Sequence, residues 1–380
     1  MSVIYNQPPD PGQPPAAGQP PAADQAPRRW RRAAAIGAAS AVAASAATGI
    51  AWAAAGASTQ QVLTTAEITA RTDPAVVDVV TALGYQHAAA AGTGVVLTSD
   101  GEVLTNNHVV DGATSIRVTD VGNGRTYKAV VVGYDRTDDI AVLQLRGASG
   151  LTTATLGDSS AVRTGGKVVG IGNAGGRGGR PSTAAGRVTG LGQTITASDQ
   201  AAGTSEQLSG IIRTSAAIQA GDSGGPLVNR YGQVIGIDTA ASSSLRFQSG
   251  AGQTQSFAIP VNKALSIASS IEAGKSSATV HIGATAFLGV GLSPGTGLPG
   301  GSASTGVAIA GALSGSPAAR AGLTAGDEIV SVGGRPVTSS SDIQAALASH
   351  HPGDTISVSW LDSSGQSHTA SLVLAAGPAQ

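Results

Sequence analysis

One serine in this chain stands in a setting suited to covalent catalysis. Residues 221–226 read Gly-Asp-Ser-Gly-Gly-Pro, and an apolar pair, Leu227-Val228, follows them. The neighbouring glycines allow a tight loop that presents the Ser223 hydroxyl, and they leave backbone N–H groups able to face a developing oxyanion. An ordinary Ser/Gly turn uses the same residue types. A nucleophilic role for Ser223 therefore requires a histidine and a carboxylate elsewhere in the chain.

The best histidine for that role is His108. It is one of six histidines, and it lies where the strand-like run 103–110 breaks into polar residues, Thr-Asn-Asn-His. An imidazole has an unperturbed pKa of about 6.5, so it can take a serine proton at neutral pH. A satisfied structural histidine is the alternative, and the polar context favours a general base.

Two adjacent aspartates are candidates for the third member. Asp139 opens the apolar run 139–145, which has strand character. A carboxylate at the mouth of a buried strand can be kept dry and fixed against an imidazole N–H. Asp138 competes closely, whereas Asp111 and Asp120 stand near turn glycines that explain them. The residues alone leave the choice between Asp139 and Asp138 open.

The order His108, Asp139, Ser223 resembles that of the HtrA family, chymotrypsin-like proteases followed by a PDZ domain. The motifs are Thr-Asn-Asn-His-Val-Val, Asp-Ile-Ala-Val-Leu and Ala-Gly-Asp-Ser-Gly-Gly-Pro-Leu-Val, and the resemblance extends over residues 72–376. It is strongest to exported HtrA-type proteases of mycobacteria and other actinobacteria. The resemblance implies a double six-stranded β-barrel and favours Asp139 over Asp138 as the triad acid.

The resemblance also implies an oxyanion hole, made by the backbone N–H groups of Gly221 and Ser223. One residue departs from the family pattern. The position before the serine is often Asn in HtrA relatives, whereas here it is Asp222, as in digestive proteases whose zymogen activation pairs it with a new N-terminal amine. This catalytic region opens with Asp-Pro-Ala-Val-Val at 73–77 instead of an Ile-Val-Gly-Gly start. We therefore expect Asp222 to be paired locally or partly solvated, and loop ordering to set the activity.

The same resemblance places the primary specificity pocket near Ala217 and Ile218. Their side chains are small or apolar and carry no charge, so the pocket is expected to accept small or medium aliphatic residues and to reject Lys and Arg. The strand at 234–240, with Thr239 and Ala240 at its end, is expected to form the opposite wall and offer an edge to an extended substrate.

The C-terminal part of the chain resembles a bacterial PDZ domain. Its clearest motifs are Ser-Pro-Ala-Ala-Arg-Ala-Gly-Leu at 316–323 and Gly-Asp-Glu-Ile-Val-Ser-Val at 326–332. A helix near 341–347 would line the peptide groove. The loop expected to capture a hydrophobic peptide C-terminus through its backbone N–H groups consists of Phe287, Leu288, Gly289 and Val290.

The N-terminal part has a different composition. Residues 1–32 are Pro-rich, expected to be disordered, and end in an Arg cluster. The uncharged, Ala-rich segment 33–57 is long enough to cross a bilayer, with the N-terminus in the cytoplasm and the protease outside. It is interpreted as a single-pass membrane anchor or, alternatively, as a signal sequence whose cleavage releases a secreted protease. A polar linker is expected at 58–72.

The remaining composition fits an all-β enzyme and excludes several other classes. Of the 380 residues, 12% are charged, the net charge is -1 and there is no cysteine. Nucleic-acid binding and disulfides are therefore not expected, and neither a cofactor nor a metal site is predicted. Short strand-like runs separated by turn signals indicate a mainly β protein. The domain boundaries that follow are 73–273 for a trypsin-like protease domain, 274–283 for a linker and 284–376 for the PDZ domain.

Together these features predict an HtrA-type serine endopeptidase that degrades unfolded or damaged cell-envelope proteins. The family resemblance also implies a homotrimer. Two other functions are compatible with parts of the sequence: a chaperone-like or scaffolding protein with minor proteolysis, and an esterase. The first is disfavoured because all three triad residues are present, and the second because the residues after Ser223 predict a strand instead of a helix.

Overall fold

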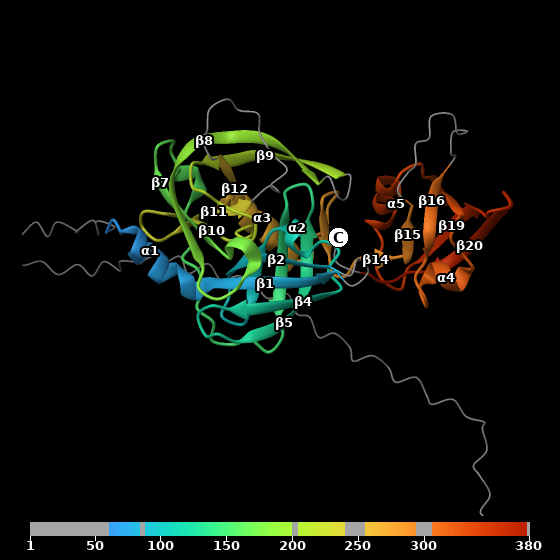
Figure 1. Ribbon diagram of the computed structural model, residues 1–380, viewed down its shortest axis with the longest axis horizontal. Helices are drawn as coiled ribbons and strands as arrows, with labels where there is room; N and C mark the ends of the chain where they lie inside the picture. The colour runs from blue at the N-terminus through green and yellow to red at the C-terminus, as the bar shows by residue number, and fades with distance from the viewer. Residues whose placement is uncertain (1–60, 84–87, 200–203, 240–254, 294–305, 378–380) are drawn as a thin grey trace, which may run out of the picture.

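The computed structural model describes residues 61–83, 88–199, 204–239, 255–293 and 306–377. These residues form two bodies, a larger one at the left of Figure 1 and a smaller, orange-to-red one at the right. The predicted tail 1–32 and the apolar segment 33–57 lie outside the described ranges. Within those ranges, no helix has both the length and the apolar character needed to cross a membrane.

The first half of the larger body is a closed six-stranded barrel. Its strands follow the order β5-β4-β1-β2-β3-β6, and β5 pairs with β6 to close it. In β4, Ile116 and Val118 are buried while Ser115 and Arg117 are exposed, as the alternation of side chains along a strand requires. The bounds are β1 (Val76–Leu83), β2 (Ala88–Val96), β3 (Glu102–Thr105), β4 (Ser115–Asp120), β5 (Thr126–Asp135) and β6 (Ile140–Leu145).

A second closed barrel of six strands follows, in the order β10-β11-β12-β9-β8-β7. One apolar cluster contains residues of both barrels, among them Leu104 and Ile140 of the first and Ile171 and Ile237 of the second. This shared core fixes the two barrels against each other. The bounds are β7 (Lys167–Gly172), β8 (Ser182–Asp199), β9 (Thr204–Thr214), β10 (Pro226–Asn229), β11 (Val234–Thr239) and β12 (Ser256–Pro260).

Two helices flank the barrels. Helix α1 (Thr65–Thr72) begins with a capping box, in which Thr64 and Glu67 satisfy each other's backbone N–H groups, and it lies within the segment expected to be a linker. Helix α3 (Val261–Glu272) follows β12 and buries Val261, Ala264 and Ile267 among other apolar side chains. Short 3-10 turns lie at Asp73–Ala75, Ser159–Ala161 and Ala174–Gly176.

The smaller body is the PDZ domain. A sheet of order β15-β16-β17-β19-β20 packs with two helices around Trp360, Ile329 and Ile309, and β18 pairs with β17. The bounds are β14 (Ala286–Phe287), β15 (Val290–Leu292), β16 (Val307–Ala312), α4 (Pro317–Ala321), β17 (Glu328–Val332), β18 (Arg335–Pro336), α5 (Ser340–Leu347), β19 (Thr355–Leu361), β20 (Ser367–Val373) and β21 (Ala375–Ala376). The prediction of a mainly β protein with two six-stranded barrels and a PDZ domain is thereby confirmed.

The segment between the two bodies contains a strand. Strand β13 (Val280–Ile282) pairs antiparallel with the end of β5, with Val280 opposite Asp135. The Thr279 hydroxyl donates to Asp135 Oδ2 at 2.8 Å. Beyond the strand pairing, both ring nitrogens of His281 lie within hydrogen-bond distance of backbone carbonyls, at 3.0 Å from Ala348 and 3.2 Å from Ala284. Three residues of the predicted linker 274–283 therefore form a strand of the first barrel's sheet.

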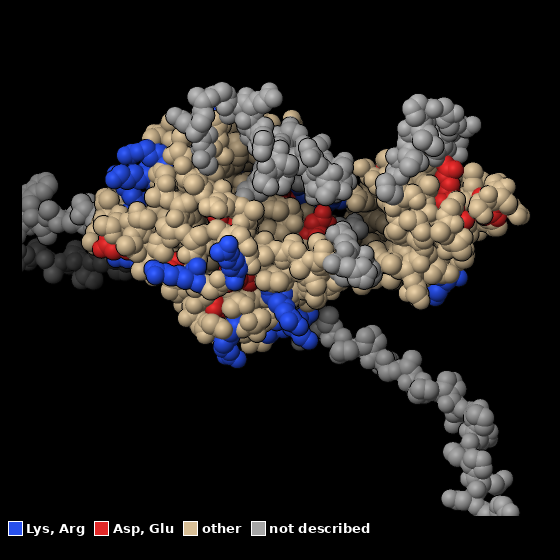
Figure 2. Space-filling model, viewed as in Figure 1, with Lys and Arg blue, Asp and Glu red and all other residues tan. Residues whose placement is uncertain are grey.

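The face shown in Figure 2 is largely uncharged. Lys and Arg side chains occur there in separate small groups, most of them over the larger body, with uncharged areas between them. This distribution follows from the low charged fraction of the chain, 12%. Such a face offers no continuous basic track along which a polyanion could lie.

Candidate active site

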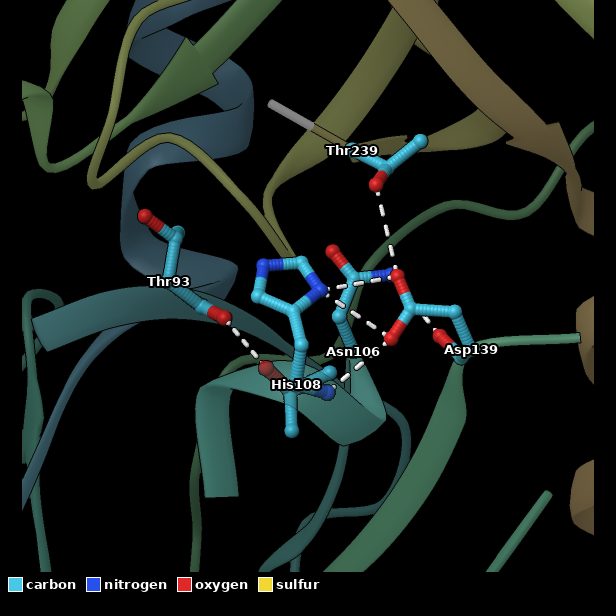
Figure 3. Close-up of polar contacts among 6 residues, drawn as sticks. Thr93, Asn106, His108, Asp139 and Thr239 are labelled. Atoms are coloured by element: carbon cyan, nitrogen blue, oxygen red, sulfur yellow. Dashed lines mark hydrogen bonds and ion pairs between the residues drawn. The ribbon is translucent and has the colours of Figure 1, made fainter. Parts of the chain in front are cut away.

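The imidazole of His108 lies against the carboxylate of Asp139 (Figure 3). His108 is on the four-residue helix α2 (Asn107–Val110), which directly follows β3. Its Nδ1 is 3.0 Å from Asp139 Oδ1 and 2.8 Å from Oδ2, and its backbone N–H donates to Oδ1 at 3.0 Å. The His108 side chain is 42% exposed and that of Asp139 is 3% exposed. A buried carboxylate thus orients a ring that remains open to solvent.

Asp139 is held on all sides by the polypeptide. Its backbone has φ 53, and among the described residues it is the one non-glycine residue with positive φ. Aspartate tolerates this left-handed conformation better than most residues do. The Asn106 side-chain amide donates to the Asp139 carbonyl at 2.9 Å, and the Thr239 hydroxyl donates to Oδ2 at 3.3 Å. Asp138, the competing candidate, instead forms an ion pair with Lys263 of α3.

Ser223 lies on a loop that is fixed to β11 on one side. The Gly224 N–H donates to the Asp238 carbonyl at 2.8 Å, and the Asp238 N–H donates to the Gly225 carbonyl at 2.7 Å. Gly224 has φ 85, and a Cβ there would lie only 2.1 Å from the Thr93 carbonyl oxygen. Glycine is therefore required immediately after the serine.

Thr93 of β2 fixes the same loop to the first barrel. Its N–H donates to the Ser223 carbonyl at 2.8 Å, and its hydroxyl donates to the Gly221 carbonyl at 2.7 Å. The hydroxyl also accepts the Asn173 N–H at 2.8 Å, and the Thr93 carbonyl accepts the Thr105 hydroxyl at 2.7 Å (Figure 3). Sequence reasoning missed this residue. The feature of the sequence that could have identified it is a threonine between two glycines, Gly92 and Gly94, on a buried strand.

Gly92 marks where the histidine helix and the serine loop converge. A Cβ on Gly92 would lie 2.6 Å from Val109 Cγ1 and 3.2 Å from the Ser223 carbonyl oxygen. The residue after His108 and the catalytic loop therefore pack against the same point of β2. This contact brings two of the three predicted triad members, 115 positions apart in the sequence, to one edge of the barrel junction.

The predicted oxyanion hole lies beside the loop that follows β7. Gly221 has φ 96, and a Cβ there would lie 2.2 Å from the Asn173 carbonyl oxygen. The Gly175 N–H donates to the Ala220 carbonyl at 2.7 Å, which ties the two loops together. Within the described part of the chain, the Gly221 N–H has no hydrogen-bond acceptor, so it remains available to an oxyanion.

Asp222 is buried and paired locally. Its Oδ1 accepts the Ser182 hydroxyl at 2.7 Å, and its Oδ2 accepts the Gln219 N–H at 2.9 Å. A neighbouring buried carboxyl, Asp238, has no hydrogen-bond partner for either oxygen among the described residues. Burial, and secondly the charge of Asp222, raise the pKa of Asp238 well above its usual value. Sequence reasoning passed over both Ser182 and Asp238.

The predicted pocket residues differ in their surroundings. Ile218 is buried and Ala217 is exposed. Both precede the serine loop, and neither brings a charge to the site. The hydroxyl of Thr239 contacts Asp139, so at least this part of its side chain serves the triad. Ala240 lies outside the described residues. The role of these four residues in substrate binding stays a prediction.

The predicted peptide-binding loop of the PDZ domain joins β14 to β15. Gly289 has φ 79, and a Cβ there would lie 2.2 Å from Ser316 Cβ. The Leu288 carbonyl accepts the Ala318 N–H at 2.9 Å, and the Leu288 side chain is buried. Phe287 and Val290 are half-buried. Strand β15 stands at the end of its sheet, so an extended peptide can add to its edge.

Known protein families match each of the two bodies of this structure. A trypsin-like peptidase domain matches residues 92–237, and a PDZ domain matches residues 286–364. The serine protease Do-like HtrA of Lactococcus lactis is 36% identical over 290 residues, which are 74% of this chain and 70% of that protein. The chain belongs to the HtrA family of serine proteases.

Other HtrA relatives are similar over comparable lengths. Serine protease PepD of Mycobacterium tuberculosis is 35% identical over 324 residues, which are 81% of this chain but 65% of PepD. The chain therefore spans slightly less than two thirds of that relative. A solved structure, HtrA-type protease AlgW with tripeptide, aligns with 31% identity and a TM-score of 0.46, covering 83% of this chain and 98% of the other.

Replacing Asp139 by Asn tests the assignment of the triad acid. The amide keeps the shape of the carboxylate, but its NH2 group can donate to His108 Nδ1 where a carboxylate oxygen accepted, so the ring adopts the wrong tautomer. We expect kcat to fall by about 10⁴-fold, as in other Ser-His-Asp enzymes. The measurement is peptide hydrolysis, and Asp138→Asn is the matched control.

The control variant loses only the partly exposed ion pair with Lys263. It should keep kcat within about threefold of the wild type, because such pairs contribute little. A larger loss in Asp138→Asn than in Asp139→Asn would contradict the assignment.

Proposed function

We propose that this protein is an HtrA-type serine endopeptidase that cleaves unfolded or damaged cell-envelope proteins. The observation that carries the proposal is the contact of His108 Nδ1 with the buried Asp139 carboxylate, beside a loop that holds Ser223 between glycines. These groups supply the base, its orienting acid and the nucleophile that acyl transfer needs.

The reaction follows from this geometry. Asp139 accepts a hydrogen bond from the Nδ1–H group of His108, so the Nε2 lone pair of His108 can take the proton of the Ser223 hydroxyl. The serine oxygen then adds to the scissile carbonyl, and the oxyanion is stabilised by the N–H groups of Gly221 and Ser223. Histidine returns the proton to the leaving amine as the peptide bond breaks. Water, activated in the same way, hydrolyses the acyl-enzyme and regenerates the serine.

Substrate selection is proposed to occur at two places. Ala217 and Ile218 offer small, uncharged surface near the serine, which supports a preference for small or medium aliphatic residues at the cleaved bond. The loop 287–290 and the free edge of β15 support recognition of hydrophobic C-termini. Assembly as a trimer is part of the same proposal and rests on the family resemblance alone.

We also propose an extracytoplasmic location. The support is the sequence of 33–57, an uncharged segment that follows an Arg cluster. As an uncleaved helix this segment would anchor the protease to the membrane with its N-terminus in the cytoplasm; as a signal sequence it would release a secreted enzyme.

Removing the Ser223 hydroxyl tests the proposed chemistry. Ser223→Ala should reduce casein hydrolysis by about 10⁶-fold, because the covalent step is lost. Ser266→Ala, which alters an exposed serine on α3, should keep wild-type activity. Equal hydrolysis by the wild type and Ser223→Ala would remove the protease assignment and favour a chaperone-like binding protein.

Calorimetric titration of the full chain carrying Ser223→Ala tests the PDZ proposal. A peptide with a hydrophobic C-terminal residue and a free carboxylate should bind at least about tenfold more tightly than its C-terminally amidated form, because the loop would lose charge-assisted hydrogen bonds. Equal affinity for the two peptides would show that the loop does not capture carboxylates.

Mapping the mature N-terminus by mass spectrometry tests the location. A membrane-fraction protein that begins before residue 33 supports the anchor, and a culture-fraction protein that begins near residues 53–58 supports cleavage. A full-length protein confined to the cytosol would refute both.

A further inference from the structure

Two carboxyl groups lie together beneath the serine loop, and the triad uses neither. Strand β7 carries glycine at positions 170 and 172, which share one face because side chains alternate along a strand. A Cβ on Gly170 would lie 2.8 Å from Asp238 Oδ2, and a Cβ on Gly172 would lie 2.8 Å from Asp222 Oδ1. Each glycine thus makes room for one carboxyl group. Positions two apart on a strand are separated by about 7 Å, which sets the spacing of the pair.

The two carboxyl groups differ in their hydrogen bonds. Asp222 accepts the Ser182 hydroxyl and the Gln219 N–H, so its negative charge is stabilised. Asp238 is fully buried, and neither of its oxygens has a partner among the described residues. An isolated carboxylate is very costly in such a place, whereas a neutral carboxylic acid is tolerated. Burial and the nearby Asp222 both raise the pKa of Asp238.

The groups facing Asp238 offer no compensating positive charge. From β7 it faces Gly170, against which the Ile218 side chain also lies, and its backbone is paired with Ala258 of β12. Strand β10 carries no ionisable side chain. Basic residues on the other strands of this barrel are engaged elsewhere: Lys167 is exposed at the start of β7, Arg187 on β8 donates to the Gly165 carbonyl, and Arg213 on β9 donates to the Thr189 carbonyl. Asp222 is the ionisable group that acts on Asp238.

The backbone of Asp238 connects this carboxyl to catalysis. Its N–H and carbonyl bind Gly225 and Gly224, the two residues after the nucleophile. Asp222 directly precedes the nucleophile. Repulsion between two negative charges at these positions would therefore act on the serine loop from both sides.

We propose that Asp238 is a positioning residue for Ser223 that works as a neutral carboxylic acid, and that its ionisation beside Asp222 displaces the serine loop and ends catalysis at alkaline pH. The inference deepens the proposed peptidase function and rests on it. Asp238 does not touch the substrate. It acts through its backbone hydrogen bonds to Gly224 and Gly225, and the proton on its side chain prevents charge repulsion with Asp222.

The sign of the pH dependence follows from the direction of the shift. A carboxyl group that holds its proton more tightly when folded favours the folded loop at low pH, and this contribution is lost as pH rises through the folded-state pKa. The wild type should therefore show an alkaline limb in kcat/KM. Asp238→Asn keeps the shape without an ionisable proton and should abolish that limb.

The experiment compares pH profiles of peptide hydrolysis and of Ser223 phosphonylation by an active-site phosphonate ester. Wild-type rates should fall by about tenfold per pH unit above the midpoint, as a single ionisation requires. Asp238→Asn should stay flat over the same range. Asp120→Asn, which alters a buried aspartate of the first barrel that caps its own turn, should keep the wild-type limb. An unchanged limb in Asp238→Asn, or loss of the wild type's circular dichroism over that range, would overturn the proposal.

A second measurement does not depend on activity. The infrared carbonyl band of a protonated carboxyl group is recorded at neutral pH in Glu272→Gln, because burial also raises the pKa of Glu272 to about 8. A band should remain in this variant, and its absence would overturn the proposal whether or not the Asn variant folds. Burial also raises the pKa of Asp73, Asp78 and Asp120, so the spectrum is recorded again with Asp238→Asn added, and the band should weaken. If hydrolysis is missing at every pH while the band weakens in this way, the peptidase function fails and the neutral state of Asp238 stands.

Discussion

The catalytic loop depends on being held between the two barrels. Thr93 of the first barrel binds the carbonyls of Gly221 and Ser223, and Asp238 of the second barrel binds Gly224 and Gly225. The loop has little regular structure of its own, so its conformation exists only where both barrels are in place. The shared apolar core that joins Leu104 to Ile237 thereby becomes a condition for activity as well as for stability.

Local sequence was sufficient for most of the fold and for the members of the candidate triad. Each triad residue lies in a short motif whose residue types reflect its own chemistry, and the motifs occur in a recognisable order. Short apolar runs between turn glycines predicted the barrels for a similar reason, since alternation and turn chemistry are properties of neighbouring residues. The directions in which side chains point were harder to predict from the sequence. Asp138 and Asp139 are adjacent, and the left-handed backbone at Asp139 determines which of them faces His108.

The features that sequence reasoning missed depend on pairings between distant segments. The glycines beside Thr93 mark a crowded position, but they do not indicate that Thr93 meets a loop about 130 positions later. In the sequence Asp238 is an ordinary residue near a strand end, and its isolation becomes visible only once Gly170 of β7 lies beside its carboxyl group. The pairing of β13 with β5 was likewise hidden, because a segment of three strand residues has almost no pattern of its own.

The position of β13 has a mechanical consequence. Asp135, which accepts the Thr279 hydroxyl through Oδ2, also accepts the Asp138 N–H through Oδ1 at 3.1 Å. One carboxylate therefore joins the interdomain segment to the turn that presents Asp139. Only residues 283–285 separate β13 from β14, so little slack chain lies between the two domains. A force that displaces the PDZ domain would consequently act on β13. The carboxylate of Asp135 would transmit it, by hydrogen bonds, to the turn that carries Asp139.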